Sequence, residues 1–340
     1  MSALAAVSLG SVSTARSMQV NEVGRVRDLV AEHFGPSATV SYHLNRGGFV
    51  NYSFAVDRDG EALWVKVAED EEGGGGLVRW ARLGGLLAER YSAPPVLEAV
   101  RIGGCVALVF PCLDHPRATQ SDFIASVDQL LVLLGHLRCD EDLADELRGT
   151  QPRTTGQAFR EVWHRRLSED LALLAESAVP FVDDHLATWM AAETAAMGAA
   201  TNSPAFAGLV TSPVHGDLWT ENVLVAPDRL WVLDWDDLGL GDPLLDESIV
   251  LFNAYGPDIG SWQAVRPPRE AAEADRFAVA ARAQQLDLVI DSLADWVEAA
   301  KAAEHREAVR EEKEQVHRLA LQLYRERYAY DEPWIAGQAR

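Results

Sequence analysis

The sequence predicts an α+β chain folded into two lobes, a small antiparallel-sheet N-lobe followed by a mainly helical C-lobe. Short runs of alternating apolar and polar residues, separated by glycine-rich turns, are concentrated before Pro111. Beyond that point, long segments with apolar residues at helical spacing dominate, interrupted by one hairpin after residue 220. The length of 340 residues fits one large domain or two closely associated lobes.

The N-terminal elements are set by periodicity and by turn residues. Asp59-Gly60 and Gly103-Gly104 each separate two strand-like runs, which is typical of tight hairpins. A glycine-rich break, 71–76, precedes a helix that ends before Pro94-Pro95. The predicted elements are a helix at 23–34, strands at 40–56 and 62–68, a helix at 77–91, and a strand pair at 96–100 and 105–109.

The C-terminal part is predicted to be helical on both sides of the hairpin. The expected helices lie at 121–137, 157–176, 182–199, 271–300 and 303–328. We therefore divide the chain into a flexible N-terminus at 1–20, an N-lobe at 21–113 and a C-lobe at 114–340.

Composition excludes several classes of protein. Hydrophobic residues make up 48% of the chain, which is enough for a full core and rules out a disordered protein. No apolar run approaches the ~20 residues of a membrane helix, and three cysteines without metal-site spacing favour a reducing, cytoplasmic location. A net charge of −22 makes nucleic acid an improbable partner.

The negative charge is concentrated in the C-lobe. There are 10 basic and 12 acidic residues up to Leu113, against 20 basic and 40 acidic from Asp114 onward. This excess is compatible with a cationic substrate or simply with the solubility requirements of an acidic proteome.

The segment 214–237 contains the strongest functional pattern. Residues 222–225 and 230–233 are predicted strands joined by the four-residue turn 226–229. Such a hairpin sets Val225 against Leu230, which places Asn222 beside Asp234 at the open end. Asp217 lies on the loop entering that end, so two carboxylates and one amide converge.

This trio of side chains suits phosphoryl transfer. Mg²⁺ prefers oxygen ligands, typically one or two from protein together with nucleotide phosphates, and Asn222 and Asp234 can supply them. The remaining carboxylate, Asp217, can orient a hydroxyl and accept its proton as the catalytic base.

The motif H-G-D-x-x-x-x-N at 215–222, followed by D-W at 234–235 and G-D-P-x-x-D at 241–246, resembles the aminoglycoside phosphotransferase and choline-kinase-like family. The resemblance implies a protein-kinase-like fold, with Asp217 as base, Asn222 and Asp234 as Mg²⁺ ligands, and bracing roles for the aspartates of the last motif. It further implies ATP or GTP as co-substrate, bound by the N-lobe, and a catalytic and substrate-binding C-lobe.

Candidate nucleotide-binding residues lie between and within the predicted strands. Gly47, Gly48 and Asn51 belong to a loop whose backbone N–H groups could approach phosphate. Lys66 lies in an apolar strand and corresponds, by the resemblance, to the phosphate-binding lysine; a lysine pointing to water from an edge strand is the alternative. The family's glutamate partner for this lysine is replaced by Trp80, which leaves Glu71, Glu72 and Glu89 as candidates.

The segment 108–113 resembles the family's interlobe linker, whose backbone hydrogen-bonds the adenine edge. Because Pro111 lacks an N–H group, Phe110 and Cys112 are the expected contacts.

Acidic residues recur at helical spacing on the helix expected at 271–300. They would share one face and could meet ammonium groups of a substrate, or they could form a solvated face. Four further candidates flank the catalytic loop, namely Trp219, Glu221, Asp236 and Asp237. The principal expected substrate-binding residues are Trp219, Glu221, Asp237, Asp287, Asp291, Asp295 and Glu298.

We therefore expect a phosphotransferase that moves the γ-phosphate of a nucleoside triphosphate, ATP by preference, to a hydroxyl of a small cationic molecule such as an aminoglycoside antibiotic. A metabolic kinase for choline, homoserine or an amino sugar is the alternative. A non-catalytic binding module and a metal-dependent hydrolase are less consistent with the trio, and neither nucleic acid nor membrane is an expected partner.

Overall fold

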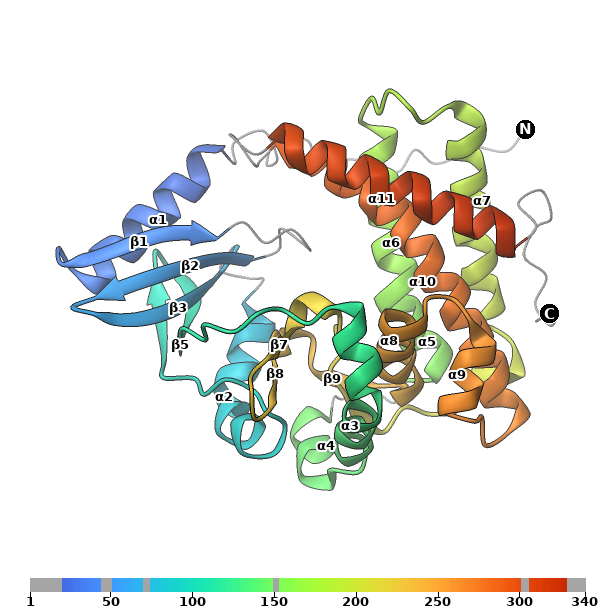
Figure 1. Cartoon of the computed structure of the whole chain (residues 1–340), viewed down its shortest axis with the longest axis horizontal. Helices are drawn as coiled ribbons and strands as arrows, with labels where there is room; N and C mark the ends of the chain where they lie inside the picture. Colours follow the sequence, from blue (N-terminus) through green and yellow to red (C-terminus); the bar gives the residue numbers. More distant parts are fainter. Residues whose placement is uncertain (1–19, 44–50, 70–73, 149–152, 301–305, 329–340) are drawn as a thin grey trace, which may run out of the picture.

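The computed structural model describes residues 20–43, 51–69, 74–148, 153–300 and 306–328. It has the predicted two lobes, with the strand-rich N-lobe beside a larger helical C-lobe (Figure 1). The expected flexible terminus lies outside the described residues, apart from Val20. The exact division of the chain at residue 113 stays a prediction.

The N-lobe is built on a five-stranded antiparallel sheet in the order β1-β2-β3-β5-β4. Both predicted tight turns are present: Asp59 and Gly60 have φ of 55° and 85°, and Gly103 and Gly104 have φ of 60° and 94°. Positive φ at both central residues matches the twist of the flanking strands. The strands are β1 (Ala38–His43), β2 (Asn51–Arg58), β3 (Glu61–Ala68), β4 (Glu98–Ile102) and β5 (Cys105–Pro111).

One helix covers each face of this sheet (Figure 1). Helix α1 (Val20–Phe34) buries Val30 against Phe54 and Val65. Helix α2 (Gly75–Arg90) packs on the opposite face, where Trp80 meets Phe110 with ring centroids 4.8 Å apart. The alternation of side chains along β3 and β5 thus supplies two separate apolar surfaces.

Helix α2 is also attached to the C-lobe. Its buried side chains share one hydrophobic cluster with Trp235, which follows the catalytic hairpin. At the end of the helix, the Tyr91 hydroxyl donates to Asp140 at 2.5 Å. The helix therefore fixes the sheet to the segment that carries the predicted catalytic residues.

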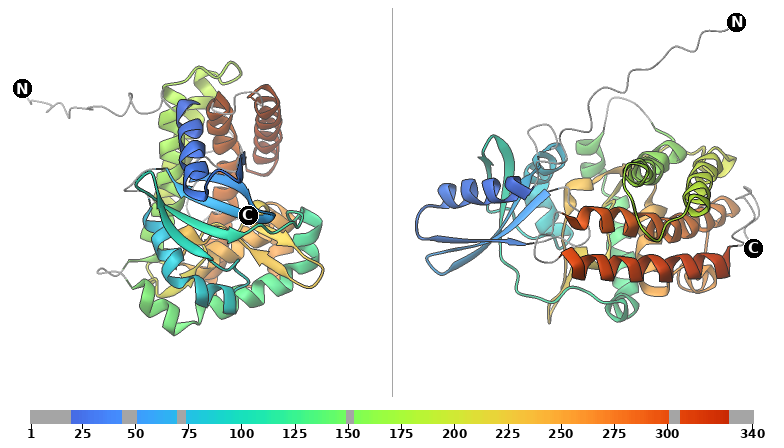
Figure 2. Two further views of the ribbon diagram at one scale, coloured as in Figure 1. Left: turned by 90° about the vertical axis from the view of Figure 1, so that its left-hand side faces the viewer. Right: turned by 90° about the horizontal axis from the view of Figure 1, so that it is seen from above.

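The C-lobe is organised around one long helix, α10, whose Leu286, Val289, Ile290 and Leu293 are fully buried. Helix α11 runs beside α10, as two views agree (Figures 1 and 2). The helical elements are α3 (Gln120–Arg138), α4 (Glu141–Leu147), α5 (Thr155–Phe159), the π-helical turn η2 (Arg160–His164), α6 (Arg165–Ala175), α7 (Asp184–Ala200), η3 (Pro204–Phe206), α8 (Pro243–Tyr255), α9 (Ile259–Val265), α10 (Ala271–Glu298) and α11 (Arg306–Arg327).

Two short strand pairs lie between α7 and α8. Strand β6 (Ser212–Val214) pairs with β9 (Gly239–Gly241), and β7 (Val223–Val225) pairs with β8 (Leu230–Val232). The 3₁₀ turns η4 (Thr220–Asn222) and η5 (Trp235–Asp237) flank the second pair. Across the described residues, no helix combines the length and the apolar character needed to cross a bilayer.

Candidate active site

The hairpin formed by β7 and β8, which carries the predicted catalytic residues at its open end, has the predicted register. Val225 pairs with Leu230, and the Leu233 N–H donates to the Asn222 carbonyl at 2.8 Å. Asn222 therefore lies next to Asp234, as the length of the turn requires. The segment 116–118, which follows the interlobe linker, runs beside β7, where the Ala118 N–H donates to the Val223 carbonyl at 2.8 Å.

The loop that leads to Asp217 is fixed by a buried carboxylate. Asp246 of α8 accepts from the His215 N–H at 2.6 Å and from the Gly216 N–H at 2.9 Å. Gly216 has φ of +91°, and a Cβ added there would lie 3.1 Å from the Asp237 carbonyl oxygen. The glycine thus permits a turn and a close backbone approach that a side chain would obstruct.

The buried ring of His215 also holds this loop in place. Burial lowers the pKa of His215 to about 4, so the ring is neutral. Its Nδ1 accepts from the Asp217 N–H at 3.2 Å, which leaves Nε2 as the donor to the Leu233 carbonyl at 2.8 Å. This buried histidine is therefore a structural link between the loop and the hairpin.

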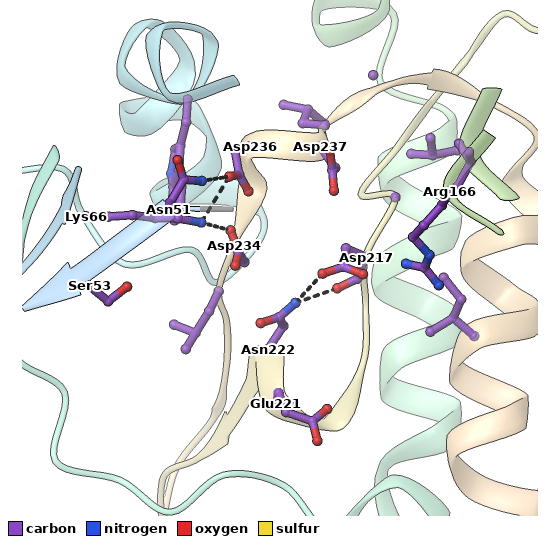
Figure 3. Close-up of a pocket in the computed structure, with 18 of the residues that line it drawn as sticks. Asn51, Ser53, Lys66, Arg166, Asp217, Glu221, Asn222, Asp234, Asp236 and Asp237 are labelled. Carbon is purple, nitrogen blue, oxygen red and sulfur yellow. Dashed lines mark hydrogen bonds and ion pairs between the residues drawn. The ribbon is translucent and has the colours of Figure 1, made fainter. Parts of the chain in front are cut away.

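Asp217 and Asn222 are in direct contact. The Asn222 Nδ2 donates to both the carbonyl and a carboxylate oxygen of Asp217, each at 2.8 Å (Figure 3). Burial, followed by the charge of Asp234, raises the pKa of Asp217 to about 8, and Arg166 opposes this rise. A raised pKa makes this carboxylate a stronger proton acceptor whenever it is ionised.

Asp234 occupies an unusual backbone conformation. Its φ and ψ are 62° and 61°, in the left-handed region. Among the described residues other than glycine, only Asp59 and Ser92 also have positive φ. Non-glycine residues held in this region occur often at functional sites, where surrounding contacts compensate for the strain.

Lys66 reaches across from β3 to this segment. Its Nζ contacts Asp234 and lies 3.0 Å from Asp236 Oδ2 (Figure 3). Burial alone would lower the pKa of Lys66, but the two carboxylates outweigh burial and raise it. The alternative of an edge-strand lysine pointing to water is therefore wrong.

The acidic partner of Lys66 is not one of the three glutamates considered from the sequence. Glu89 is exposed, and Glu71 and Glu72 lie outside the described residues. Trp80 does face the lysine, with Nζ 5.8 Å from its ring centroid. The carboxylate that the sequence reasoning did not assign to Lys66 is Asp236, two residues after Asp234.

The backbone of the interlobe linker is partly engaged within the sheet. The Cys112 N–H donates to the Ala62 carbonyl at 3.0 Å, so it is engaged within the sheet. Hydrogen-bonded pairs alternate along an antiparallel ladder, so the Phe110 N–H, opposite Trp64, also points toward β3. By the same alternation the Pro111 carbonyl and the Leu113 N–H are directed away from β3. All four residues of 110–113 line the cleft, and which of them meets an adenine edge stays a prediction.

A single cleft of about 1320 Å³ joins the catalytic residues to the acidic helix α10. Asp291, Asp295 and Glu298 line this cleft, as does Asp170 of α6. Asp287 does not line it; its carboxylate is buried and paired with Arg166, whose Nε donates to it at 3.2 Å. Asp287 is therefore corrected to a residue that positions Arg166.

The acidic residues of α10 also have basic partners that the spacing did not predict. Lys313 of α11 lies 2.5 Å from Asp295 Oδ2. Arg166 is paired with Asp287, and it also interacts electrostatically with Asp217 and Asp291. Figure 3 shows Arg166 on the side of the site where Asp217 lies. Arg166 and Asp170 are the C-lobe residues that sequence reasoning missed, because nothing in 157–176 indicates which helix face meets the cleft.

The remaining predicted residues divide into three groups. Trp219 packs against Phe252, with ring centroids 6.0 Å apart, and does not line the cleft, so it is corrected to a packing residue. Glu221 and Asp237 line the cleft. Asn51 lines it too and donates to Asp236 Oδ2 at 2.8 Å, whereas Gly47 and Gly48 lie outside the described residues.

The donor set is compatible with Mg²⁺ held together with a nucleotide. Because Asn222 Nδ2 is engaged by Asp217, its Oδ1 is available as a ligand beside the Asp234 carboxylate. Within the described part of the chain, no group of three or more His, Cys, Asp or Glu residues is arranged to hold a metal.

Comparison with known proteins identifies the family. The model of the phosphotransferase enzyme family matches residues 41–284. The chain belongs to this family. The match includes the N-lobe sheet beyond residue 40, the interlobe linker and the whole catalytic segment of this phosphotransferase.

Solved structures share its protein-kinase-like fold at low sequence identity. A GDP and kanamycin complex of APH(2")-IIia is 14% identical, with a TM-score of 0.52, over 91% of this chain and 99% of that one. A thermostable APH(4)-Ia with ADP and hygromycin B is 14% identical, with a TM-score of 0.54, over 86% and 98%. A macrolide 2'-phosphotransferase type I is 18% identical, with a TM-score of 0.50, over 83% and 96%.

A curated relative matches over a short stretch only. Protein LicA of Haemophilus influenzae is 40% identical over 47 residues, which covers 14% of this phosphotransferase and 14% of LicA. This local similarity carries no argument about the whole protein.

Proposed function

We propose that this phosphotransferase moves the γ-phosphoryl group of a nucleoside triphosphate, ATP by preference, to a hydroxyl of a small cationic acceptor of the aminoglycoside type. The observation that supports it most is the convergence of Asp217, Asn222 and Asp234 with Lys66 in one cleft. Family membership supports the reaction class, and the neighbours' complexes with GDP or ADP are compatible with a nucleotide co-substrate.

In this proposal Asp217 receives the proton of the acceptor hydroxyl while the acceptor oxygen forms a bond to the γ-phosphorus. The bond from that phosphorus to the nucleoside diphosphate breaks, and the diphosphate leaves. Asn222 orients Asp217 through Nδ2, so the carboxylate is positioned before the acceptor arrives. Mg²⁺, held by Asn222 Oδ1 and Asp234, would neutralise charge on the phosphates.

The acceptor is proposed to be cationic because of the C-lobe wall of the cleft. Asp291, Asp295 and Glu298 line that wall, and the chain is strongly acidic overall. Arg166 and Lys313 compensate only part of this charge. Ammonium groups of an acceptor would compensate more of it. Fold neighbours have been solved in complex with kanamycin and with hygromycin B.

The test is Mg²⁺-dependent nucleotide consumption by the full-length protein against a panel of aminoglycosides, amino sugars, choline and homoserine. Stimulation by a polycationic aminoglycoside, lost in Asp217→Ala, is the expected result. Stimulation by choline, homoserine or a simple amino sugar alone would retain phosphoryl transfer and favour the metabolic alternative. Nucleotide-independent turnover, or full activity of Asp217→Ala, would contradict the mechanism.

A further inference from the structure

The ammonium group of Lys66 is enclosed near two carboxylates from one short segment. The lysine side chain is 11% exposed, and Nζ contacts both Asp234 and Asp236. A buried ammonium requires a permanent negative partner. Helix α2 provides no such partner among its described residues, because its single acidic residue, Glu89, is exposed and Trp80 occupies the position facing the lysine.

The two carboxylates differ in how firmly they are held. Asp236 Oδ2 accepts from Asn51 at 2.8 Å as well as from Lys66 (Figure 3). The Asp236 carbonyl accepts from Arg79 of α2 at 2.6 Å. The first turn of α2 packs directly on this backbone, because a Cβ added to Gly76 would lie 2.5 Å from the same carbonyl oxygen. Asp236 is thus fixed from both the sheet and the helix.

Asp234 has Lys66 as its basic partner among the described residues, and its carboxylate also contacts that of Asp236. If Asp234 is to hold a divalent cation, the ammonium must withdraw from it, since two cations at one carboxylate repel each other. A second carboxylate that stays beside Lys66 makes this withdrawal possible without leaving the lysine unpaired.

We propose that Asp236 is a positioning residue that serves as the fixed counter-ion of Lys66 and thereby leaves Asp234 free for the metal. This inference rests on the proposed nucleotide-dependent function. The segment after β8 thus supplies the carboxylate that neutralises the Lys66 ammonium. Helix α2 does not supply one, because Trp80 faces the lysine.

The test compares wild type and Asp236→Asn in the full-length protein by calorimetric titration with ADP and with a non-hydrolysable ATP analogue, at increasing Mg²⁺ and in excess chelator. In Asp236→Asn, Lys66 and Mg²⁺ must compete for Asp234. We expect the Mg²⁺ concentration that gives half of the maximal gain in nucleotide affinity to rise about tenfold or more. A loss of this size is what removing a charge-assisted hydrogen bond implies. In chelator, nucleotide affinity should stay unchanged or increase, because Lys66 still meets the phosphates.

The control is Glu89→Gln, which removes the exposed acidic residue of α2 and should leave both titrations unchanged. A double variant, Trp80→Glu with Asp236→Asn, places a carboxylate on α2 opposite Lys66 and should restore the wild-type Mg²⁺ response. Circular dichroism would verify that each variant is folded.

The outcomes separate the inference from the proposed function. A wild-type protein that binds no nucleotide would overturn the proposed function and the inference together. If wild type binds nucleotide with Mg²⁺ but Asp236→Asn shows the same Mg²⁺ response, or loses affinity equally with and without Mg²⁺, the inference alone is overturned.

Discussion

The Asn222 Nδ2 lies 2.8 Å from two oxygens of Asp217, one in the backbone and one in the carboxylate. One amide group therefore fixes both the loop and the side chain of the proposed base. The same contact leaves the Asn222 Oδ1, the proposed ligand of the metal ion, not engaged by Asp217.

Substituting Asp217 tests the base directly. In Asp217→Asn the new amide oxygen can still accept the hydrogen bond from Asn222, but the side chain can no longer accept a proton. We therefore expect kcat to fall by about 10²–10⁴-fold. Nucleotide affinity should stay close to wild type, because Asp217 faces the acceptor. Steady-state kinetics and calorimetry check both points. Asp228→Asn, an exposed carboxylate at the turn of the same hairpin, is the matched control and should behave as wild type.

Asp246 should influence the rate of the reaction indirectly, because it holds the backbone of the loop that carries Asp217. Asp246→Asn replaces one acceptor oxygen with an amide that faces a backbone N–H group, which should lower the free energy of unfolding by about 1–3 kcal/mol. Because the loop carries Asp217, kcat should fall more than nucleotide affinity. Chemical denaturation and kinetics measure the two effects.

The control for this variant is Asp258→Ala, which removes the N-cap of α9. Loss of a cap costs about 0.5–2 kcal/mol, so overall stability falls by a comparable amount away from the loop. An equal loss of kcat in both variants would show that Asp246 acts through stability alone.

The linker geometry predicts a specific pattern of amide hydrogen exchange. The Cys112 N–H is bonded to Ala62 in the free protein and should already be protected. The Leu113 N–H, directed away from β3, should exchange rapidly in the free protein and become protected when an adenine nucleotide binds. Residue-resolved exchange with and without nucleotide measures this difference, and nucleotide-dependent protection confined to Cys112 would refute it.

The acidic wall predicts a pH-dependent stability. Burial, together with Asp291 and Asp287, raises the pKa of Asp170 from its usual 3.8 to about 8. The folded state therefore binds this proton more tightly than the unfolded state. The resulting stabilisation is fully present below about pH 4 and is lost as the pH rises through about 8.

Asp170→Asn removes this titration. Its melting temperature should be close to that of wild type near pH 4 and should exceed it increasingly up to about pH 8. Thermal denaturation across this range is the measurement. Glu176→Gln, an exposed site at the end of α6, should follow wild type at every pH, and a constant offset between Asp170→Asn and wild type would contradict the assignment.

Much of the catalytic centre could be predicted because its geometry is local. A four-residue turn fixes the pairing of Val225 with Leu230, and this register alone carries Asn222 to Asp234. The tight turns at Asp59-Gly60 and Gly103-Gly104 were likewise recognisable, because positive φ requires particular residues. The direction of the Cys112 N–H group in the interlobe linker could not be predicted. Which N–H groups of a strand point to its neighbour can be assigned only when the neighbouring strand and the register are known.

The acidic residues of α10 show what helical periodicity in the sequence cannot predict. The spacing of Asp287, Asp291 and Asp295 correctly predicts neighbouring positions on one helix, but not what packs against them. In the structure α6 brings Arg166 to Asp287, and α11 brings Lys313 to Asp295. Which carboxylates face the cleft was therefore decided by the packing of three helices.

The sequence by itself determined the two-lobed α+β fold, the hairpin register and the convergence of Asp217, Asn222 and Asp234, because each follows from short-range backbone geometry. Only the tertiary structure decided that Lys66 meets Asp236, 170 residues away, and that Asp287 is buried with Arg166. The physical reason is that ion pairs between distant elements depend on how whole helices and sheets pack, and no local pattern encodes that arrangement.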